Sequence, residues 1–284
     1  MILTNVSAVK ELLSRHGFKF AKPLGQNFLV NPSVCPRMAR GLSGNIVEIG
    51  AGAGVLTREL ANTAEKVIVV EIDETLGPVL AETLAGCDNV EIIWGDALKT
   101  DLRALIEEKF GGGEAAVCAN LPYYAAARII TRMLEARPPI SSVTVMVQEE
   151  VAQRITALPN SKQYGVLSVV SRFYGNPKLL FKVPRGSFIP IPNVDGAVIR
   201  LDVYRGKRPG VTDEKRFFRF VKAAFSERRK QLANPVSRAL GTDKESVKRA
   251  LGGCGINASA RAQELSVDDF IRLYNKFENN QFTI

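Results

Sequence analysis

The stretch NLPYY, residues 120–124, brings an amide and two phenol rings to the end of an apolar run, AAVCA. Such residues could act on an exocyclic aromatic amine, which is a poor nucleophile because its lone pair is delocalised into the ring. Acceptors for its two N–H groups would favour a pyramidal nitrogen. We expect the Asn120 side-chain oxygen and the Leu121 carbonyl to be these acceptors, with the Tyr123 ring stacked on the base. Tyr124 is expected to pack inward.

A methyl group carried on a sulfonium would suit such a site, because the departing thioether is neutral and needs no acid. Positioning and electrostatics would then carry the reaction. The chain holds one histidine, His16, and four cysteines without CxxC spacing, so we expect neither a metal site nor histidine-based catalysis. A Pro-Tyr turn packed on the core remains the alternative interpretation of NLPY alone.

A glycine-rich segment, VEIGAGAGVLTREL, places Gly50, Gly52 and Gly54 between an expected strand and an expected helix. Glycines allow close backbone approach, and the following helix offers free N–H groups. The dinucleotide fingerprint GxGxxG would need glycine where Val55 stands. The ExGxGxG spacing is typical of a cradle for a carboxylate, although a plain tight turn would also use these glycines.

Two acidic residues end the next two expected strands, at VIVVEID and WGD. Strand ends face the ligand crevice of open α/β sheets. Glu71 could accept both hydroxyls of a ribose, and Asp96 could accept from an adenine amino group. Together they favour a nucleoside cofactor, although nicotinamide adenine dinucleotide would suit Glu71 equally well.

Apolar runs alternate with helical patterns from Asn45 to about Gln148, which predicts an α/β fold of Rossmann-like type with a mostly parallel sheet. Strands are expected at 45–50, 66–73, 89–96, 115–122 and 142–148. Helices are expected at 55–64, 74–84, 101–109 and 125–136. Further strands, at 164–175, 177–184 and 197–204, should close the sheet with an antiparallel edge.

A Gly-, Pro- and charge-rich break at 204–215 predicts two domains. The first is residues 1–205, with an N-terminal helical extension over 1–44 that includes a short amphipathic helix. The second is residues 206–284, an all-helical domain with helical patterns at 214–240, 243–253 and 266–277.

Net charge is +9, and it is unevenly placed. Residues 201–284 hold 17 Lys and Arg against 10 Asp and Glu, whereas the remainder holds 21 against 19. This asymmetry indicates an anionic partner for the C-terminal domain. Within its SERRKQL run, we expect Arg228, Arg229 and Lys230 to contact phosphates, although a solvated face of a long helix is the simpler interpretation.

No apolar run approaches the ~20 residues that span a bilayer, and the N-terminus lacks a signal-peptide core. We therefore expect a cytoplasmic protein.

The chain resembles the KsgA-type ribosomal RNA adenine dimethyltransferases, which use S-adenosylmethionine. The resemblance runs in the family's order through most of the chain. Its motifs are KPLGQNFL (22–29), VEIGAGAGVLT (47–57), VEID (70–73), GDAL (95–98), NLPYY (120–124), VQEEVAQRI (147–155), FIPIPNVDGAVIRL (188–201), AFSERRKQL (224–232) and ARAQELSVDDFIRL (260–273).

The resemblance implies a role for each matching residue. Asn27 and Leu29 would contact the methionine end of the cofactor, with Gly50 and Gly52 lining its cradle and Glu71 holding the ribose. Asp96 and Asn120 would flank the adenine and methyl end, and Tyr123 and Phe188 would sandwich the target adenine. The family commonly has Lys where this chain has Asn193, which bears on one contact to the RNA backbone.

The implied substrate is a pair of adjacent adenosines near the 3′ end of 16S rRNA, dimethylated at N6 in an immature small ribosomal subunit by a monomeric enzyme. Two alternatives stay open: a large-subunit rRNA methyltransferase of the macrolide-resistance type, and a non-catalytic RNA-binding assembly factor. A nicotinamide oxidoreductase is disfavoured by Val55.

Overall fold

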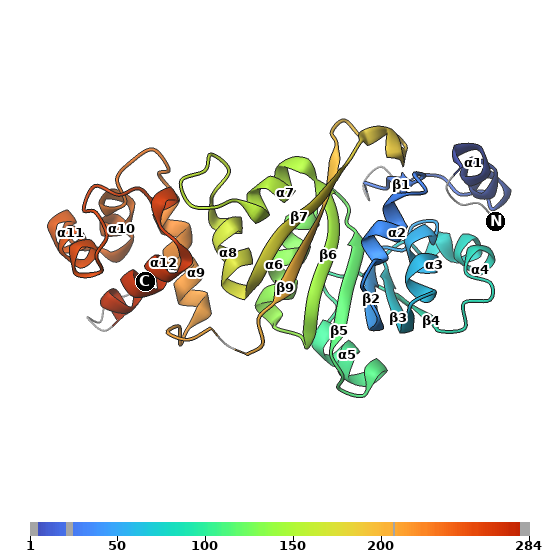
Figure 1. The fold of residues 1–284 in the computed structure, drawn as a ribbon, viewed down its shortest axis with the longest axis horizontal. Helices are drawn as coiled ribbons and strands as arrows, with labels where there is room; N and C mark the ends of the chain where they lie inside the picture. The colour runs from blue at the N-terminus through green and yellow to red at the C-terminus, as the bar shows by residue number, and fades with distance from the viewer. Residues whose placement is uncertain (1–4, 21–24, 207, 279–284) are drawn as a thin grey trace. The chain divides into compact units, whose positions relative to one another are not determined.

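Seven strands form one sheet in the order β4-β3-β2-β5-β6-β9-β7 (Figure 1). In the computed structural model, which describes residues 5–20, 25–206 and 208–278, the strands are β2 (Gly44–Ile49), β3 (Ala64–Glu71), β4 (Val90–Trp94), β5 (Ala115–Asn120), β6 (Ile140–Gln148), β7 (Gly175–Val183) and β9 (Gly196–Val203). The pairs β2–β3, β2–β5, β3–β4 and β5–β6 are parallel, whereas β6–β9 is antiparallel. The predicted mostly parallel sheet with an antiparallel edge is confirmed.

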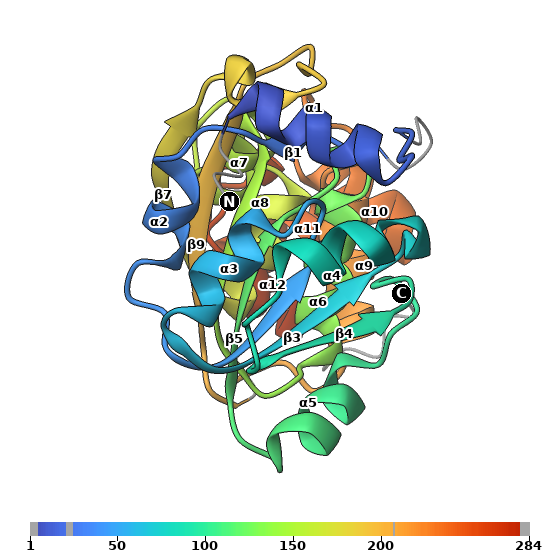
Figure 2. The ribbon, with the colours of Figure 1, turned by 90° about the vertical axis from the view of Figure 1, so that its right-hand side faces the viewer.

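Helices cover both faces of this sheet, as expected for strands joined by helical crossovers. In chain order the first seven α-helices of the described residues are α1 (Val6–Arg15), α2 (Val34–Ala39), α3 (Val55–Ala61), α4 (Gly77–Thr83), α5 (Leu102–Phe110), α6 (Ala126–Ala136) and α7 (Glu149–Thr156). Figures 1 and 2 show α3 and α4 on one face and α6 on the other. The amphipathic N-terminal helix and the four predicted crossover helices are confirmed.

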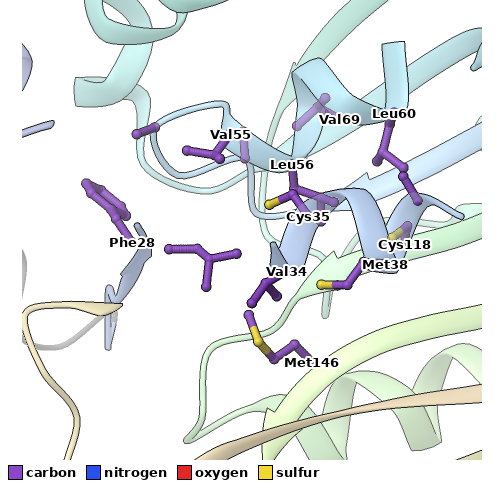
Figure 3. Packing of buried hydrophobic residues seen from close by; sticks show 14 of the residues in the cluster. Phe28, Val34, Cys35, Met38, Val55, Leu56, Leu60, Val69, Cys118 and Met146 are labelled. Carbon is purple, nitrogen blue, oxygen red and sulfur yellow. The ribbon is translucent and has the colours of Figure 1, made fainter. Parts of the chain in front are cut away.

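An apolar core lies between the sheet and the helices α2 and α3. Figure 3 shows side chains of α2 and α3 in one buried cluster with residues of the neighbouring strands. Among its members are Val34, Cys35, Met38, Leu56, Leu60 and Cys118. Burial of this kind contributes roughly 25 cal/mol per Å² of apolar surface, so the cluster holds α2 and α3 against the sheet.

A separate two-stranded ribbon pairs β1 (Phe28–Leu29) with β8 (Phe188–Ile189) in antiparallel fashion, with Leu29 opposite Phe188. The ribbon joins segments that lie about 160 residues apart in the chain. The KPLGQNFL motif begins at residues 22–24, which lie outside the described residues, so its described part is the segment 25–29.

Gly54 begins α3 in a left-handed conformation, with φ of 81°. A Cβ atom at this position would lie 2.8 Å from the Thr83 hydroxyl and 3.2 Å from a methyl carbon of Leu84. The third glycine of the ExGxGxG run therefore allows α3 to approach the end of α4, and its role is in packing.

The C-terminal half contains a second compact unit, formed by residues 153–176 together with 204–284. The first unit comprises residues 1–152 and 177–203. The last segment of the second unit begins beside the predicted boundary at 205/206. Residues 153–176, which the sequence pattern assigns to the first domain, pack instead with the C-terminal helices. Lys207 and residues 279–284 lie outside the described residues.

The predicted strand at 164–175 is wrong, because this segment forms helix α8 (Val166–Tyr174). Its Val-rich sequence is typical of a strand, and most residues of the helix are buried, including both serines. The polar residues Ser168, Ser171 and Arg172 are spaced by three and four, as in a helix, but the β-branched composition outweighs this short signal. The Phe173 ring packs against those of Phe217 and Phe218 in the following helix.

The long helix predicted at 214–240 is interrupted. The structure has α9 (Glu214–Ala224), a turn region at 225–232, and α10 (Ala233–Leu240). Pro235 explains the restart: inside a continuous helix its missing N–H would leave the preceding turn unbonded, whereas in the first turn of α10 that donor is not needed. The unit is completed by α11 (Lys244–Gly253) and α12 (Val267–Glu278), both predicted.

The close approach at Gly54 predicts that Gly54→Ala destabilises the first unit by roughly 2–4 kcal/mol, because a left-handed alanine is strained and its Cβ would press on α4. Gly86 is the matched control: it has the same φ of 81°, but nothing lies within 4 Å of a Cβ built there. Urea unfolding of both variants separates strain from packing. Equal losses for Gly54→Ala and Gly86→Ala would contradict the packing role.

Candidate active site

The sheet changes winding direction between β2 and β5, and the site lies where these two strands end. The chain leaves β2 toward β3 and β4 on one side, and leaves β5 toward β6 on the other. Their carboxyl ends carry Gly50 and Asn120, and a Cβ built at Gly50 would lie 4.0 Å from the Asn120 carbonyl oxygen. In open α/β sheets, ligands bind in the crevice at such a switch point.

A cavity opens at this point and encloses about 830 Å³ of space, its open mouth included. Its lining comes from the segment 25–29, the glycine loop, and the carboxyl ends of β3 and β5. Eight of the predicted site residues line it: Asn27, Leu29, Gly50, Gly52, Glu71, Asn120, Leu121 and Tyr123. The structure therefore brings together residues from four distant parts of the chain.

Glu71 ends β3 with its side chain 5% exposed. Its carboxylate accepts hydrogen bonds from the backbone N–H of Gly52 at 3.2 Å and of Asp73 at 2.9 Å. Burial raises the pKa of Glu71, whereas these N–H groups act in the opposite direction. The two hydrogen bonds fix the carboxylate beside the glycine loop.

The segment 25–29 is tied to the cavity rim by two hydrogen bonds. Gln26 donates to the Asp73 carboxylate at 2.5 Å, and the Asn120 side-chain amide donates to the Asn27 carbonyl at 3.2 Å. The Phe28 ring lies directly over Gly52, where a Cβ would come within 3.1 Å of it. Gly52, with φ of 55°, thus permits the segment to lie close to the glycine loop.

The NLPYY turn is held by backbone hydrogen bonds at both ends. The N–H of Leu121 donates to the Met146 carbonyl at 3.1 Å, and the Pro122 carbonyl accepts from Ala125 and Ala126 as α6 begins. Because the Asn120 Nδ2 group is already donated to Asn27, its Oδ1 oxygen is the atom available as an acceptor.

Tyr123 and Phe188 are in contact, with ring centroids 6.2 Å apart and planes inclined at 72°. Phe188 is 2% exposed and does not itself line the cavity. The Tyr123 hydroxyl is buried without a hydrogen-bond partner in the described part of the chain, next to Gly196. Burial, with the nearby charge of Asp195, raises its pKa to about 12. The rings meet edge to face, so they enclose no slot for a base in this arrangement.

The expected inward packing of Tyr124 is wrong, because the side chain is 62% exposed. One edge of its ring covers Gly25, where a Cβ would lie 3.0 Å away. The turn therefore presents its two tyrosines differently: Tyr123 lines the cavity and Tyr124 faces solvent over the segment 25–29.

Asp96 is not part of the cavity lining. Its carboxylate accepts from the backbone N–H of Leu98 at 2.8 Å, and its carbonyl accepts from Lys99 and Thr100, so it caps the turn after β4.

Ile72 follows Glu71 directly, is 48% exposed, and lines the cavity although the sequence patterns do not predict it as a site residue. Its place directly after the strand-end acid is the signal that could identify it in the sequence.

Glu48 is a further cavity residue that the sequence patterns do not single out. It is the first residue of the ExGxGxG run, lines the cavity, and has no solvent exposure. Burial raises its pKa to about 8, and the charge of Glu71 adds to this effect, whereas contact with Thr57 lowers it.

The predicted phosphate-binding residues lie in the turn region 225–232 of the second unit. Arg228 donates to the Lys162 carbonyl and, at 3.3 Å, to the Gln263 side chain. Arg229 and Lys230 are exposed. The three cations thus sit on a turn, and one of them also stabilises the unit. Asn193 is exposed in the loop between β8 and β9.

None of the described helices is long and apolar enough to span a bilayer. Within the same described ranges, no three His, Cys, Asp or Glu side chains gather where they could hold a metal ion.

Comparisons with known proteins identify the family. The sequence model described as ribosomal RNA adenine dimethylase matches residues 17–279. The ribosomal RNA small subunit methyltransferase A of Geobacillus thermodenitrificans is 44% identical over 274 residues, which cover 94% of each chain. The protein of the same name from Alkaliphilus oremlandii is 42% identical, covering 96% of this chain and 97% of that one.

Among solved structures, the 23S rRNA methyltransferase ErmE resembles this chain with a TM-score of 0.68 and 27% identity, covering 89% of this chain and 100% of that one. The fold is thus that of Rossmann-like methyltransferases. With a family match through most of its length and relatives above 40% identity at nearly full coverage, the chain belongs to the ribosomal RNA adenine dimethylase family.

Proposed function

We propose that this chain dimethylates N6 of two adjacent adenosines near the 3′ end of 16S rRNA, with S-adenosylmethionine as the methyl donor. The observation that carries the proposal is the meeting of the NLPYY turn with the glycine loop at the switch point of the sheet. The relatives named ribosomal RNA small subunit methyltransferase A support the choice of substrate.

The residues of the cavity fit this cofactor. Glu71 offers a fixed carboxylate for the ribose hydroxyls, and Gly52 allows the segment 25–29 to lie over the loop beside it. Asn27 and Leu29 would contact the methionine end from the segment 25–29. When bound, S-adenosylmethionine supplies an electrophilic methyl group on a sulfonium that leaves as a neutral thioether.

Asn120 and Leu121 would prepare the amine for attack. The Asn120 Oδ1 and the Leu121 carbonyl would accept its two N–H groups, which favours a lone pair directed toward the methyl group. Both acceptors are preorganised, because Asn120 is fixed by Asn27 and Leu121 by Met146. Fixed dipoles of this kind need no reorganisation during the reaction.

Tyr123 and Phe188 would cover the two faces of the target adenine. Two rings that enclose a base must lie about 7 Å apart, since each stacking contact takes about 3.5 Å. The present edge-to-face contact therefore requires Tyr123 to rotate away from Phe188 when the base enters. Its hydroxyl has no hydrogen bond to break among the described residues, which lowers the cost of that rotation.

Asp96 would approach the adenine of the cofactor from the end of β4.

The second unit would bind the RNA backbone through Arg228, Arg229 and Lys230. We propose that the enzyme acts as a cytoplasmic monomer on an immature small subunit. Methylation of purified immature small subunits, compared with naked 16S rRNA, tests the form of the substrate.

The likeness to ErmE favours one alternative, methylation of large-subunit rRNA. The identity to the small-subunit enzymes is higher and covers both chains almost fully, so 16S rRNA is preferred. Mass spectrometry of 16S and 23S rRNA after incubation with the protein and S-adenosylmethionine decides between them. Absence of methyl groups in both RNAs and in the immature subunit would instead favour a non-catalytic assembly factor.

Glu71→Ala should weaken binding of S-adenosylmethionine by roughly 10- to 150-fold, the equivalent of about 1.5–3 kcal/mol for lost hydrogen bonds to a charged acceptor. Glu74→Ala, an exposed acid three residues further on, should bind normally. Calorimetric titration of both variants, after circular dichroism has shown that they are folded, gives the comparison. Wild-type affinity in a folded Glu71→Ala variant would refute the ribose assignment.

Tyr123→Phe should keep most activity, because stacking uses the ring and the hydroxyl has no partner among the described residues. Tyr123→Ala should lose roughly 10- to 100-fold in the rate of methyl transfer, as expected for one stacking contact. Tyr124→Ala is the control for the exposed neighbour. Single-turnover methylation at saturating cofactor measures all three, and a Phe variant as inactive as the Ala variant would show that the hydroxyl is needed.

Arg229→Glu combined with Lys230→Glu should weaken binding to 16S rRNA. The slope of the logarithm of the affinity against the logarithm of the salt concentration should decrease by the amount expected for about two lost phosphate contacts. Cofactor affinity should not change. Reversing Lys10 and Lys19, exposed on the first unit, alters net charge equally and serves as the control. If binding is unchanged at every salt concentration in the Arg229/Lys230 variant, the turn is only a solvated surface.

A further inference from the structure

Glu48 is a buried carboxyl group for which the proposed reaction has no use. It lies on β2, two residues before the glycine loop, with no exposed surface, and it lines the cavity. Neither carboxyl oxygen has a hydrogen-bond partner of good geometry in the described residues. An isolated buried carboxylate is costly, so a fold retains one only where something stabilises the charge or the group is neutral.

The groups that face Glu48 cannot balance a negative charge. They are Cys35 on α2, Thr57 on α3, Glu71 on β3 and Cys118 on β5. Figure 3 shows the two cysteines within the same buried cluster. Burial raises the pKa of both thiols, and the charge of Glu48 raises it further, so they remain neutral. Glu71 is itself acidic, and Glu59 on α3 adds another acid beside Cys35.

We infer that Glu48 is the counter-charge for the cationic part of the cofactor, and that cofactor binding ionises Glu48 and releases its proton to solvent. The inference rests on the proposed function, since S-adenosylmethionine carries two cationic groups, the sulfonium and the α-ammonium. No other bond changes: the O–H bond of the carboxyl group breaks, and the proton passes to the buffer. The bound cation supplies the partner that the fold does not provide.

The direction of the pH effect follows from linkage. With a pKa of about 8, Glu48 is about 90% protonated in the free protein at neutral pH. A ligand that binds only the ionised form can bind about one tenth of the protein molecules directly, so its apparent affinity is reduced about tenfold. The contribution of Glu48 to the affinity, taken as the ratio of wild type to the isosteric Glu48→Gln variant, should therefore rise with pH up to about 8 while the ligand keeps its charge.

The experiment is calorimetric titration with S-adenosylmethionine at about pH 7 in buffers of different ionisation enthalpy, which counts the protons exchanged. An ordinary α-amino group has a pKa of about 7.7–8.0, so the ligand can exchange a proton too. The readout is therefore the difference between wild type and Glu48→Gln, for which we expect about 0.9 proton more released by wild type. Glu74→Gln, which changes an exposed acid outside the cavity lining, should keep the wild-type count.

Two ligands identify the cation. S-adenosylhomocysteine lacks the sulfonium charge but keeps the ammonium. A Glu48-dependent proton release with both ligands supports the ammonium as partner, and release with S-adenosylmethionine alone supports the sulfonium.

A second measurement needs no variant. The carboxyl ¹³C signal of Glu48 in glutamate-labelled wild type should titrate near its raised pKa in the free protein and should shift to the ionised position when the cofactor is added. Binding without any Glu48-dependent proton release, or a signal that stays protonated in the complex, would overturn the inference while leaving the proposed function intact. A wild-type protein that binds neither ligand would overturn both.

Discussion

The parallel pairing of β2 with β5 is the contact on which the rest of the site depends. It sets the glycine loop beside the NLPYY turn, and the loop begins at Gly50 with a left-handed φ of 79° that favours glycine. Each further part of the site is fixed to this pair. Gly52 donates to Glu71, and Asn120 donates to the segment 25–29. A change of register between β2 and β5 would therefore separate the two halves of the cavity.

Burial then gives these residues their chemical character. The described cavity lining holds two carboxyl groups: Glu71, which the backbone N–H groups of Gly52 and Asp73 stabilise, and Glu48, which has no such donors in the described chain. The same buried environment leaves the Tyr123 hydroxyl unpartnered among the described residues. A ligand with hydroxyl groups and a positive charge would give Glu71 its hydrogen-bond donors and Glu48 its counter-charge. The acceptors at Asn120 and Leu121 would need no rearrangement to bind a substrate.

The convergence of the site is predictable from the sequence, because the strand ends of a parallel sheet meet at one edge and so place Glu71 and Asn120 together. The contacts and direction of individual side chains in the turns after the strands are not predictable from the sequence in this way. Asp96 caps its own turn, and Tyr124 faces solvent, since a short turn decides the direction of each side chain. The helix at 166–174 resembles a strand in its sequence because its valines favour strands, and packing within the second unit overrides that preference.

A crystal structure of the protein with S-adenosylmethionine would show whether the cavity at the switch point holds the methyl donor with its reactive end at the NLPYY turn. We expect the ribose hydroxyls within hydrogen-bond distance of the Glu71 carboxylate and the sulfonium methyl group directed toward the Asn120 Oδ1 atom. A ligand bound outside the cavity, or one whose methyl group points away from Asn120 and Tyr123, would contradict this expectation.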